Sequence, residues 1–174
     1  MEKQKVFIGV DIGINGGIVV INENGLINAH TIPVLGDKIL DIELFKIFEQ
    51  YAEYEMFICL EEVHSIFGVS AKSNFSFGTT FGKKLMISAV SNYLYGAVSE
   101  LVAPKKWQAE VWASSDKIYK AAKKVDTKKT SLMAAKRLFP SQTFLATTRS
   151  RVPHDGLVDA ALIAFYCKLR FGKN

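Results

Sequence analysis

The sequence is poor in the features that mark several classes of protein. Its two cysteines, Cys59 and Cys167, lie in apolar runs and are too few for a disulfide framework or a zinc cluster. No apolar run approaches the roughly 18 residues of a membrane span, and no basic and apolar leader opens the chain. We therefore expect reduced core cysteines, no membrane association and a cytoplasmic location.

The charges are divided unevenly along the chain. Its 174 residues are 49% hydrophobic and 22% charged, which indicates one globular domain over residues 1–174. Residues 1–100 hold seven Lys or Arg against twelve Asp or Glu, whereas residues 101–174 hold fifteen against five. The basic second part suits a polyanionic partner, although a solvated lysine-rich face explains the charge equally well.

The hydrophobic pattern predicts an α/β fold. Strands are expected at 6–13, 18–23, 26–34, 56–63 and 97–104. Helices are expected at 41–54, 79–95, 131–140 and 153–171. Asn24-Gly25 predicts a hairpin, Asp41 is a candidate N-cap, and Pro153 suits the first position of the last helix. This order predicts a mixed five-stranded sheet, an antiparallel three-strand meander plus parallel strands, with helices on both faces and a lysine-rich arm at about 105–129.

Several acidic residues stand where the fold alone would not require them. Asp11 ends the first apolar strand, and Glu61 and Glu62 end the fourth. Asp155 and Asp159 are four residues apart in the last helix and so share a face. Buried carboxylates are costly and raise one another's pKa, whereas two Mg²⁺ would balance four ionised carboxylates. The acids therefore predict a two-metal site for phosphodiester hydrolysis.

Taken singly, the same residues have structural interpretations. Asp11 could begin a turn, and Asp155 could stabilise a helix N-terminus. Only one of Glu61 and Glu62 can share a face with Asp11, and the spacing does not say which. The glycines after Asp11 permit a tight turn with positive φ and the close approach of a phosphate backbone. The metal site is the interpretation that accounts for all the acids together.

Six blocks of sequence resemble, in order, the RuvC-like Holliday-junction resolvases, in particular their phage-type branch. The blocks are IGVDIGINGGIVVI, CLEEVHS, NFSFGTTFG, VAPKKWQ, KKTSLMAAKRLFP and HDGLVDAALIAFY, and they run from about Val6 to Tyr166. The resemblance implies an RNase H-like fold, a homodimer, and paired nicking of four-way DNA junctions with Mg²⁺ or Mn²⁺. It also implies a part in DNA recombination and repair and, through its branch, a bacteriophage origin.

The resemblance assigns roles to individual acids. Asp11 matches the aspartate of the family's first strand, and Glu61 matches the glutamate of its L-E-x-V block. Asp159 matches the aspartate that precedes the apolar A-x-L-I-A stripe of the last helix. RuvC has its third aspartate three residues before the last one, where this chain has Gly156, so Asp155 is a less regular match. The expected catalytic and metal-binding residues are Asp11, Glu61, Asp155 and Asp159, with His154 as a further candidate ligand, two Mg²⁺ per site and no organic cofactor.

Branched DNA is the expected partner of the basic second part. RuvC stacks an aromatic side chain on unpaired bases from the loop after the catalytic strand, where this chain has His64 and, nearby, Phe67. Phe67 could equally be a core residue, and helix 79–95 could form the dimer face or simply pack on its own sheet. The predicted DNA-binding residues are Lys105, Lys106, Lys117, Lys124, Lys128, Lys129, Arg149, Arg151 and Phe67.

The sequence therefore predicts a metal-dependent, structure-selective endodeoxyribonuclease. Among enzymes, the alternative is an RNase H-like nuclease that acts on RNA or an RNA–DNA hybrid. Outside enzymes, the alternative is a catalytically inert junction-binding protein. The full set of carboxylates argues against the inert protein.

Overall fold

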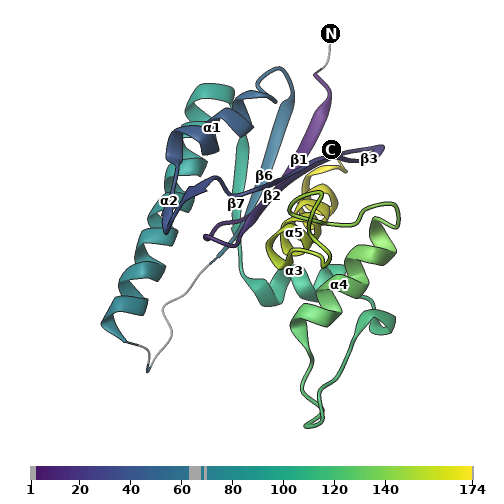
Figure 1. Ribbon diagram of the computed structural model, residues 1–174. Coiled ribbons are helices and arrows are strands. Elements are labelled where there is room, and N and C mark those ends of the chain that lie inside the picture. Colours follow the sequence, from purple (N-terminus) through teal and green to yellow (C-terminus); the bar gives the residue numbers. More distant parts are fainter. Residues whose placement is uncertain (1–2, 63–67, 69, 174) are drawn as a thin grey trace.

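A five-stranded mixed sheet forms the centre of the molecule (Figure 1). The structure is a computed structural model and describes residues 3–62, 68 and 70–173. The strands are β1 (Lys5–Asp11), β2 (Gly17–Asn22), β3 (Gly25–Thr31), β6 (Glu55–Glu61) and β7 (Val98–Val102). Their order is β3-β2-β1-β6-β7, with antiparallel pairing from β3 to β1 and parallel pairing from β1 to β7. The predicted meander and parallel strands are confirmed.

The first hairpin turns where the sequence predicted it. Asn22 pairs with Gly25 across the turn, and Gly25 has a φ of +133°, a conformation that favours glycine. A second, smaller hairpin of β4 (Val34–Leu35) and β5 (Lys38–Ile39) follows Pro33 and was not predicted. Strands of two residues are too short to carry an alternating pattern.

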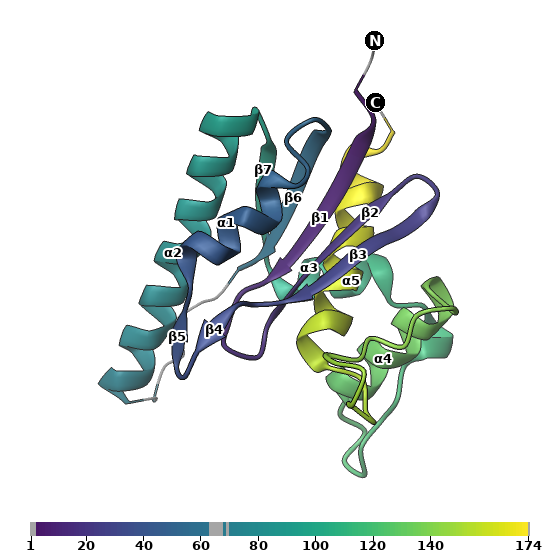
Figure 2. The ribbon, with the colours of Figure 1, turned by 45° about the horizontal axis from the view of Figure 1, so that its top comes forward.

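Helices cover both faces of the sheet (Figure 2). One face packs against α1 (Asp41–Glu49) and α2 (Ala71–Tyr95). The other packs against α5 (Asp155–Phe171), flanked by α3 (Pro104–Val111), the short 3₁₀ helix η1 (Ser114–Asp116) and α4 (Thr127–Leu138). Alternate strand residues separate the two cores, so that Ile8 and Ile58 face α1 and α2 while Phe7 and Phe57 face α5. The predicted helices on both faces are confirmed.

Four helix starts differ from the prediction, among them that of α4, which begins at Thr127 and not at residue 131. Leu40 is the N-cap of α1, so Asp41 is its first helical residue and not its cap. Ser70 caps α2 by accepting a hydrogen bond from the Ser73 amide at 3.2 Å, so this helix begins well before residue 79. Its first turns are rich in Ser, Gly and Asn, which weaken the helical pattern. The N-cap of α5 is His154, and Pro153 lies just outside the helix.

The part of the lysine-rich arm that projects is shorter than the predicted 105–129. Its first residues form α3, whose Trp107 is fully buried. Residues 117–125 project as a loop closed by a single antiparallel bridge. At the base of this loop, the Arg137 guanidinium donates hydrogen bonds to buried Asp116, the shortest at 2.7 Å, and holds the pKa of that carboxyl below its usual range. The Arg137–Asp116 ion pair therefore fixes the start of this loop against α4.

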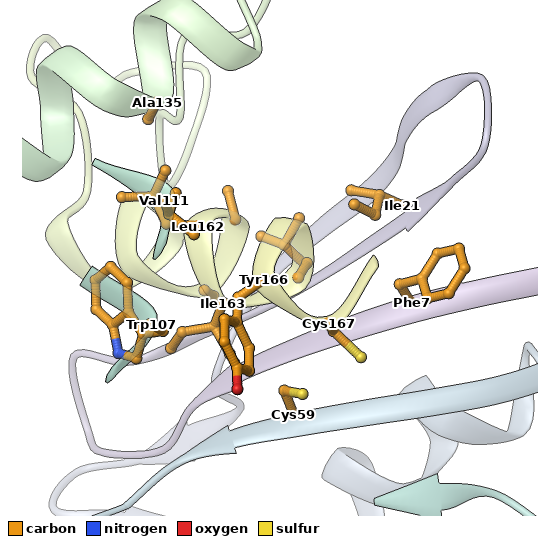
Figure 3. Packing of buried hydrophobic residues seen from close by; sticks show 14 of the residues in the cluster. Phe7, Ile21, Cys59, Trp107, Val111, Ala135, Leu162, Ile163, Tyr166 and Cys167 are labelled. Atoms are coloured by element: carbon orange, nitrogen blue, oxygen red, sulfur yellow. The ribbon is translucent and has the colours of Figure 1, made fainter. Parts of the chain in front are cut away.

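The interface between α5 and the sheet contains both cysteines (Figure 3). Cys59 on β6 and Cys167 on α5 are buried and free, and burial raises the pKa of the Cys167 thiol well above its ordinary value. Their predicted place in the core is confirmed. Over the described residues, none of the helices combines the length and apolar character needed to traverse a lipid bilayer.

Candidate active site

The carboxyl ends of β1 and β6 bring two acids together. The strands are parallel neighbours in register, so Asp11 and Glu61, the last residue of each, lie at the same edge of the sheet. Both lie on the face that α5 covers, because Phe7 and Phe57 in the α5 core precede them by an even number of residues. Glu62 has the opposite alternation. The register therefore selects Glu61 over Glu62 as the partner of Asp11.

A glycine in β1 lets α5 bring a third acid to this edge. A Cβ at Gly9 would lie 2.0 Å from the carbonyl oxygen of Ala160 and 2.2 Å from the amide nitrogen of Ala164. The backbones of β1 and α5 are thus in direct contact. Asp159, one residue before Ala160, is close enough to repel both Asp11 and Glu61 electrostatically.

The glycines between β1 and β2 serve close packing within the protein itself. The positive φ that these glycines permit is not used, because Gly13, Gly16 and Gly17 all lie outside the left-handed region. Gly16 is needed because a Cβ there would lie 2.0 Å from the carbonyl oxygen of Asp11. The β1–β2 turn is therefore folded tightly back on the end of β1.

Close packing also explains why the acid at the start of α5 is Asp155. A Cβ at Gly156 would lie 2.2 Å from the carbonyl oxygen of Asn15 and 2.6 Å from Cα of Gly16. A side chain therefore does not fit at the position where the resemblance implied the third aspartate. Asp155 is exposed instead, and its carboxylate accepts a hydrogen bond from Lys128 at 2.6 Å.

Burial and repulsion together raise the pKa of the clustered carboxyls. Burial is the main cause that raises the pKa of Asp11 to about 7, and repulsion by Glu61 and Asp159 adds to it, while Lys84 opposes it. Burial also raises the pKa of Asp159 to about 6 and that of Glu61 above its usual value. Burial and mutual repulsion thus disfavour the ionised form of these carboxyls.

The raised pKa values predict that the metal-free protein loses stability as pH rises. Between about pH 4 and pH 7 the folded Asp11 and Asp159 keep protons that the unfolded chain releases, so the free energy of unfolding falls with pH. For Asp11 alone, the loss by pH 8 is up to about 4 kcal/mol. Thermal unfolding in EDTA at pH 5 to 8 measures it.

Asp11→Asn is the control for this pH dependence. His30, whose burial lowers its pKa, acts with the opposite sign and is present in both proteins, so the difference between them isolates the carboxyl. The expected result is that the Asp11→Asn variant loses much less stability between pH 5 and pH 8 than the wild type. Equal slopes for the two proteins would contradict the assignment.

Three side chains that the sequence analysis did not assign hold the acids in place. Trp107 Nε1 donates to Glu61 Oε1 at 3.0 Å, and the Ser131 hydroxyl hydrogen-bonds the Asp159 carboxylate. Lys84 Nζ donates to the backbone carbonyl of Glu61. Ser131 and Trp107 gave no distinguishing signal, but Lys84 shares a helix face with apolar Ile87, which the helical period could have revealed.

A cavity of about 510 Å³ opens beside the acids. Its polar lining residues are Asp11, Asn15, Lys128, Ser150, Arg151, His154, Asp155 and Asp159. His154 Nδ1 is buried and has no hydrogen-bond partner among the described residues. Glu61 stands outside this lining but interacts electrostatically with Asp11 and Asp159. The structure thus brings Asp11, Asp155 and Asp159 to one cavity, with Glu61 outside its lining.

The donor set fits a hard divalent cation. Carboxylate oxygens are the ligands that Mg²⁺ and Mn²⁺ prefer, and buried Asp11 and Asp159 need a positive charge nearby. The unpartnered Nδ1 of His154 is a further donor at the cavity. Within the described ranges, no group of three or more His, Cys, Asp or Glu side chains already has the arrangement to hold a metal ion. Binding would therefore require side-chain rotation at this site.

The predicted DNA-binding residues that the structure describes are exposed and lie on three segments. Lys105 and Lys106 are in the first turn of α3, where Lys106 is held by Glu100 at 2.9 Å. The others lie on the projecting loop and the first turn of α4 (Lys117, Lys124, Lys128 and Lys129) and before α5 (Arg149 and Arg151). His64 and Phe67 lie outside the described residues, so the stacking role stays a prediction.

The fold has counterparts of known structure. T. thermophilus RuvC in complex with a Holliday junction substrate is 14% identical, with a TM-score of 0.56, over 97% of this chain and 96% of that chain. The chain has the RNase H-like fold of RuvC. A second Thermus thermophilus RuvC structure is 17% identical, with a TM-score of 0.56, over 96% of each chain. No family model and no curated protein matches the chain.

The similarity to RuvC covers nearly the whole chain, but it is a similarity of fold and not of sequence. At 14–17% identity it carries neither substrate nor mechanism from one protein to the other. The predicted RNase H-like fold is confirmed. The phage-type branch stays a prediction, because the two RuvC structures described above are from Thermus thermophilus and do not test it.

Proposed function

We propose that this protein is a divalent-metal-dependent endonuclease that cuts branched DNA, with four-way junctions as its principal substrate. The observation that carries the proposal is the meeting of Asp11, Glu61 and Asp159 at one edge of a RuvC-like sheet. Acids from both ends of the chain gather there at a cost in stability, which a structural role would not require. The RuvC structure that contains a Holliday junction supports branched DNA as the substrate class.

The residues of the site have distinct chemical roles in this proposal. Asp11 and Asp159 would hold Mg²⁺, with Glu61 beside them and His154 or Asp155 at the cavity rim. Bound Mg²⁺ would supply Lewis acidity, which lowers the pKa of the attacking water and neutralises the leaving 3′ oxygen. Trp107 orients the Glu61 carboxylate, and Ser131 orients Asp159. Two ions per site is the number that the sequence predicted.

Lys128 and Arg151 place positive charge in the lining of the acid cavity, where a DNA phosphate would approach. Both line the cavity, so a phosphate approaching Asp11 and Asp159 would meet a cation on the way. Lys128 is now paired with Asp155, and a DNA phosphate would compete for this ammonium. The projecting loop at 117–125, which carries the exposed Lys117 and Lys124, leads into α4 (Figure 1).

A contact between this loop and the DNA backbone predicts a change in salt dependence. Replacing Lys117 and Lys124 together by Gln should lower the slope of log K against log salt concentration by about 1 to 2, because each lost phosphate contact removes nearly one released counterion. Junction binding in Ca²⁺ over a salt series measures the slope. Lys46→Gln is the control, since this residue is on α1 and pairs with Glu43. An unchanged slope in the double variant would remove the loop from the DNA interface.

A homodimer is part of the proposal, because a two-fold junction offers two equivalent strands to cut. The 25-residue helix α2 supports it, since it buries few of its own residues against the sheet. Its exposed apolar side chains are Phe75, Leu85, Tyr93 and Leu94. A second copy of this chain would cover them. Light scattering of the purified protein decides between one chain and two.

A cleavage assay on three substrates tests the proposed function. The purified protein is incubated with a four-way DNA junction, a linear duplex and an RNA–DNA hybrid, each with Mg²⁺, Mn²⁺ or Ca²⁺. We expect paired nicks in the junction with Mg²⁺ and Mn²⁺ and little product from the duplex. Cleavage of the hybrid alone would favour an RNA-directed nuclease, and salt-sensitive binding without any product would favour a junction-binding protein.

A further inference from the structure

The projecting loop at 117–125 is a hydrogen-bonded hairpin (Figure 1). Tyr119 and Val125 face each other in its antiparallel bridge. Nearer the tip, the amide of Lys120 donates a hydrogen bond to the carbonyl oxygen of Lys124 at 2.8 Å. These contacts join the two arms of the loop and constrain its backbone.

Helix α4 holds the base of this hairpin. The amide of Ile118 donates to the Thr130 hydroxyl at 3.1 Å, and the amide of Asp126 donates to the Ile118 carbonyl oxygen at 2.8 Å. The ion pair between Arg137 of α4 and buried Asp116 lies just before the first arm. These contacts fix the direction in which the hairpin projects, so that a side chain on it can bind a partner at a low entropic cost.

A tyrosine ring is exposed on the hairpin among lysines. Tyr119 is 58% exposed, and its bridge partner Val125 is partly buried. Residues 117–125 contain no aspartate or glutamate. The four lysines of this segment are all exposed: Lys117, Lys120, Lys123 and Lys124. The hairpin thus combines an accessible aromatic ring with charge of one sign.

This combination fits a single DNA strand. A tyrosine ring can stack on the face of any nucleobase, while lysines contact the phosphates on either side. In a duplex each base face is covered by the next base pair, so a ring on the protein surface reaches a base face only where the strand is unpaired. Phosphate contacts alone would leave the ring in water, whereas stacking buries it.

The hairpin lies close to the acid cavity along the chain. Val125 is three residues before Lys128, which lines that cavity, so the backbone between them spans at most about 11 Å. We propose that the hairpin binds one unpaired strand of a branched DNA, with Tyr119 stacked on a base and the lysines on the neighbouring phosphates. The source of this strand rests on the proposed function. Tyr119 is on a different element from the loop after β6, where the resemblance implied a stacking residue.

Binding of a fluorescein-labelled oligothymidine, measured by anisotropy in Ca²⁺, tests the proposal without using activity. We expect Tyr119→Leu to bind this single strand about 5-fold to 100-fold more weakly than the wild type, which is the loss of one stacked base, and to bind a linear duplex almost as well. Tyr119→Phe, the matched control, keeps the ring and should bind like the wild type. The salt slope of single-strand binding should be the same in all three proteins, because a stacked base releases no counterion.

An equal loss on the oligothymidine and on the duplex, or a lower salt slope in Tyr119→Leu, would overturn the stacking role. A loss in Tyr119→Phe as large as in Tyr119→Leu would also overturn it, because the ring would then not be the group that binds. If the wild type cuts four-way junctions but Tyr119→Leu binds the single strand as the wild type does, only the role of the hairpin is overturned. If the wild type binds the single strand through Tyr119 but cuts no junction, the proposed function is overturned and the hairpin stands as a site for single-stranded DNA.

Discussion

Asp11→Asn should abolish junction cleavage and leave junction binding intact. The substitution removes one carboxylate charge from the centre of the acid cluster and keeps the shape of the side chain. In the proposal, the Asp11 carboxylate holds the metal ion that would stabilise the charge developing at the phosphate. We therefore expect a loss of about 10³-fold or more in the single-turnover rate, equivalent to about 4 kcal/mol. Binding should persist, since phosphate contacts come from basic residues outside the acid cluster.

The control separates this effect from unfolding and from a general change of charge. Asp37→Asn makes the same chemical change at an exposed turn between β4 and β5 and should cleave at the wild-type rate. Asp11→Asn should also be more stable than the wild type in EDTA at pH 8, because it removes a buried carboxylate. Cleavage near the wild-type rate would exclude Asp11 from the chemistry.

Gly9→Ala should destabilise the protein by about 3 kcal/mol or more, as well as prevent cleavage. The added methyl group would meet backbone atoms of α5 at 2.0 and 2.2 Å, and backbone cannot move aside as a flexible side chain can. Relief requires α5 to move away from β1, which carries Asp159 away from Asp11. Urea denaturation gives the loss of stability, and the junction assay gives the loss of activity.

Gly82→Ala is the matched control for this prediction. Gly82 lies within α2, and a Cβ there would have no neighbour within 4 Å. Alanine favours the helix interior over glycine, so this variant should be more stable by up to about 1 kcal/mol. Equal stability of Gly9→Ala and the wild type would mean that α5 does not depend on this contact to reach the acid cluster.

The elements that the sequence predicted well are those with a strong local signal. The strands around Val6 and Met56 are apolar and β-branched, and the Asn24-Gly25 turn has one favoured geometry. The β4–β5 hairpin and the first turns of α2 were missed because short strands and Ser- and Gly-rich segments carry little periodicity. The sequence also left the partner of Asp11 open, whereas the β1–β6 register places Glu61 on its face.

The positions of the acids along the chain were determined by the sequence alone: each stands at the end of an apolar strand or in the first turns of a helix, where local patterns are readable. Their meeting was decided by the tertiary structure. Direct contact between α5 and β1 at Gly9, and between α5 and the β1–β2 turn at Gly156, brings Asp159 to Asp11. The inward direction of Lys84 was decided in the same way, because the partners that compensate a buried charge come from distant parts of the chain.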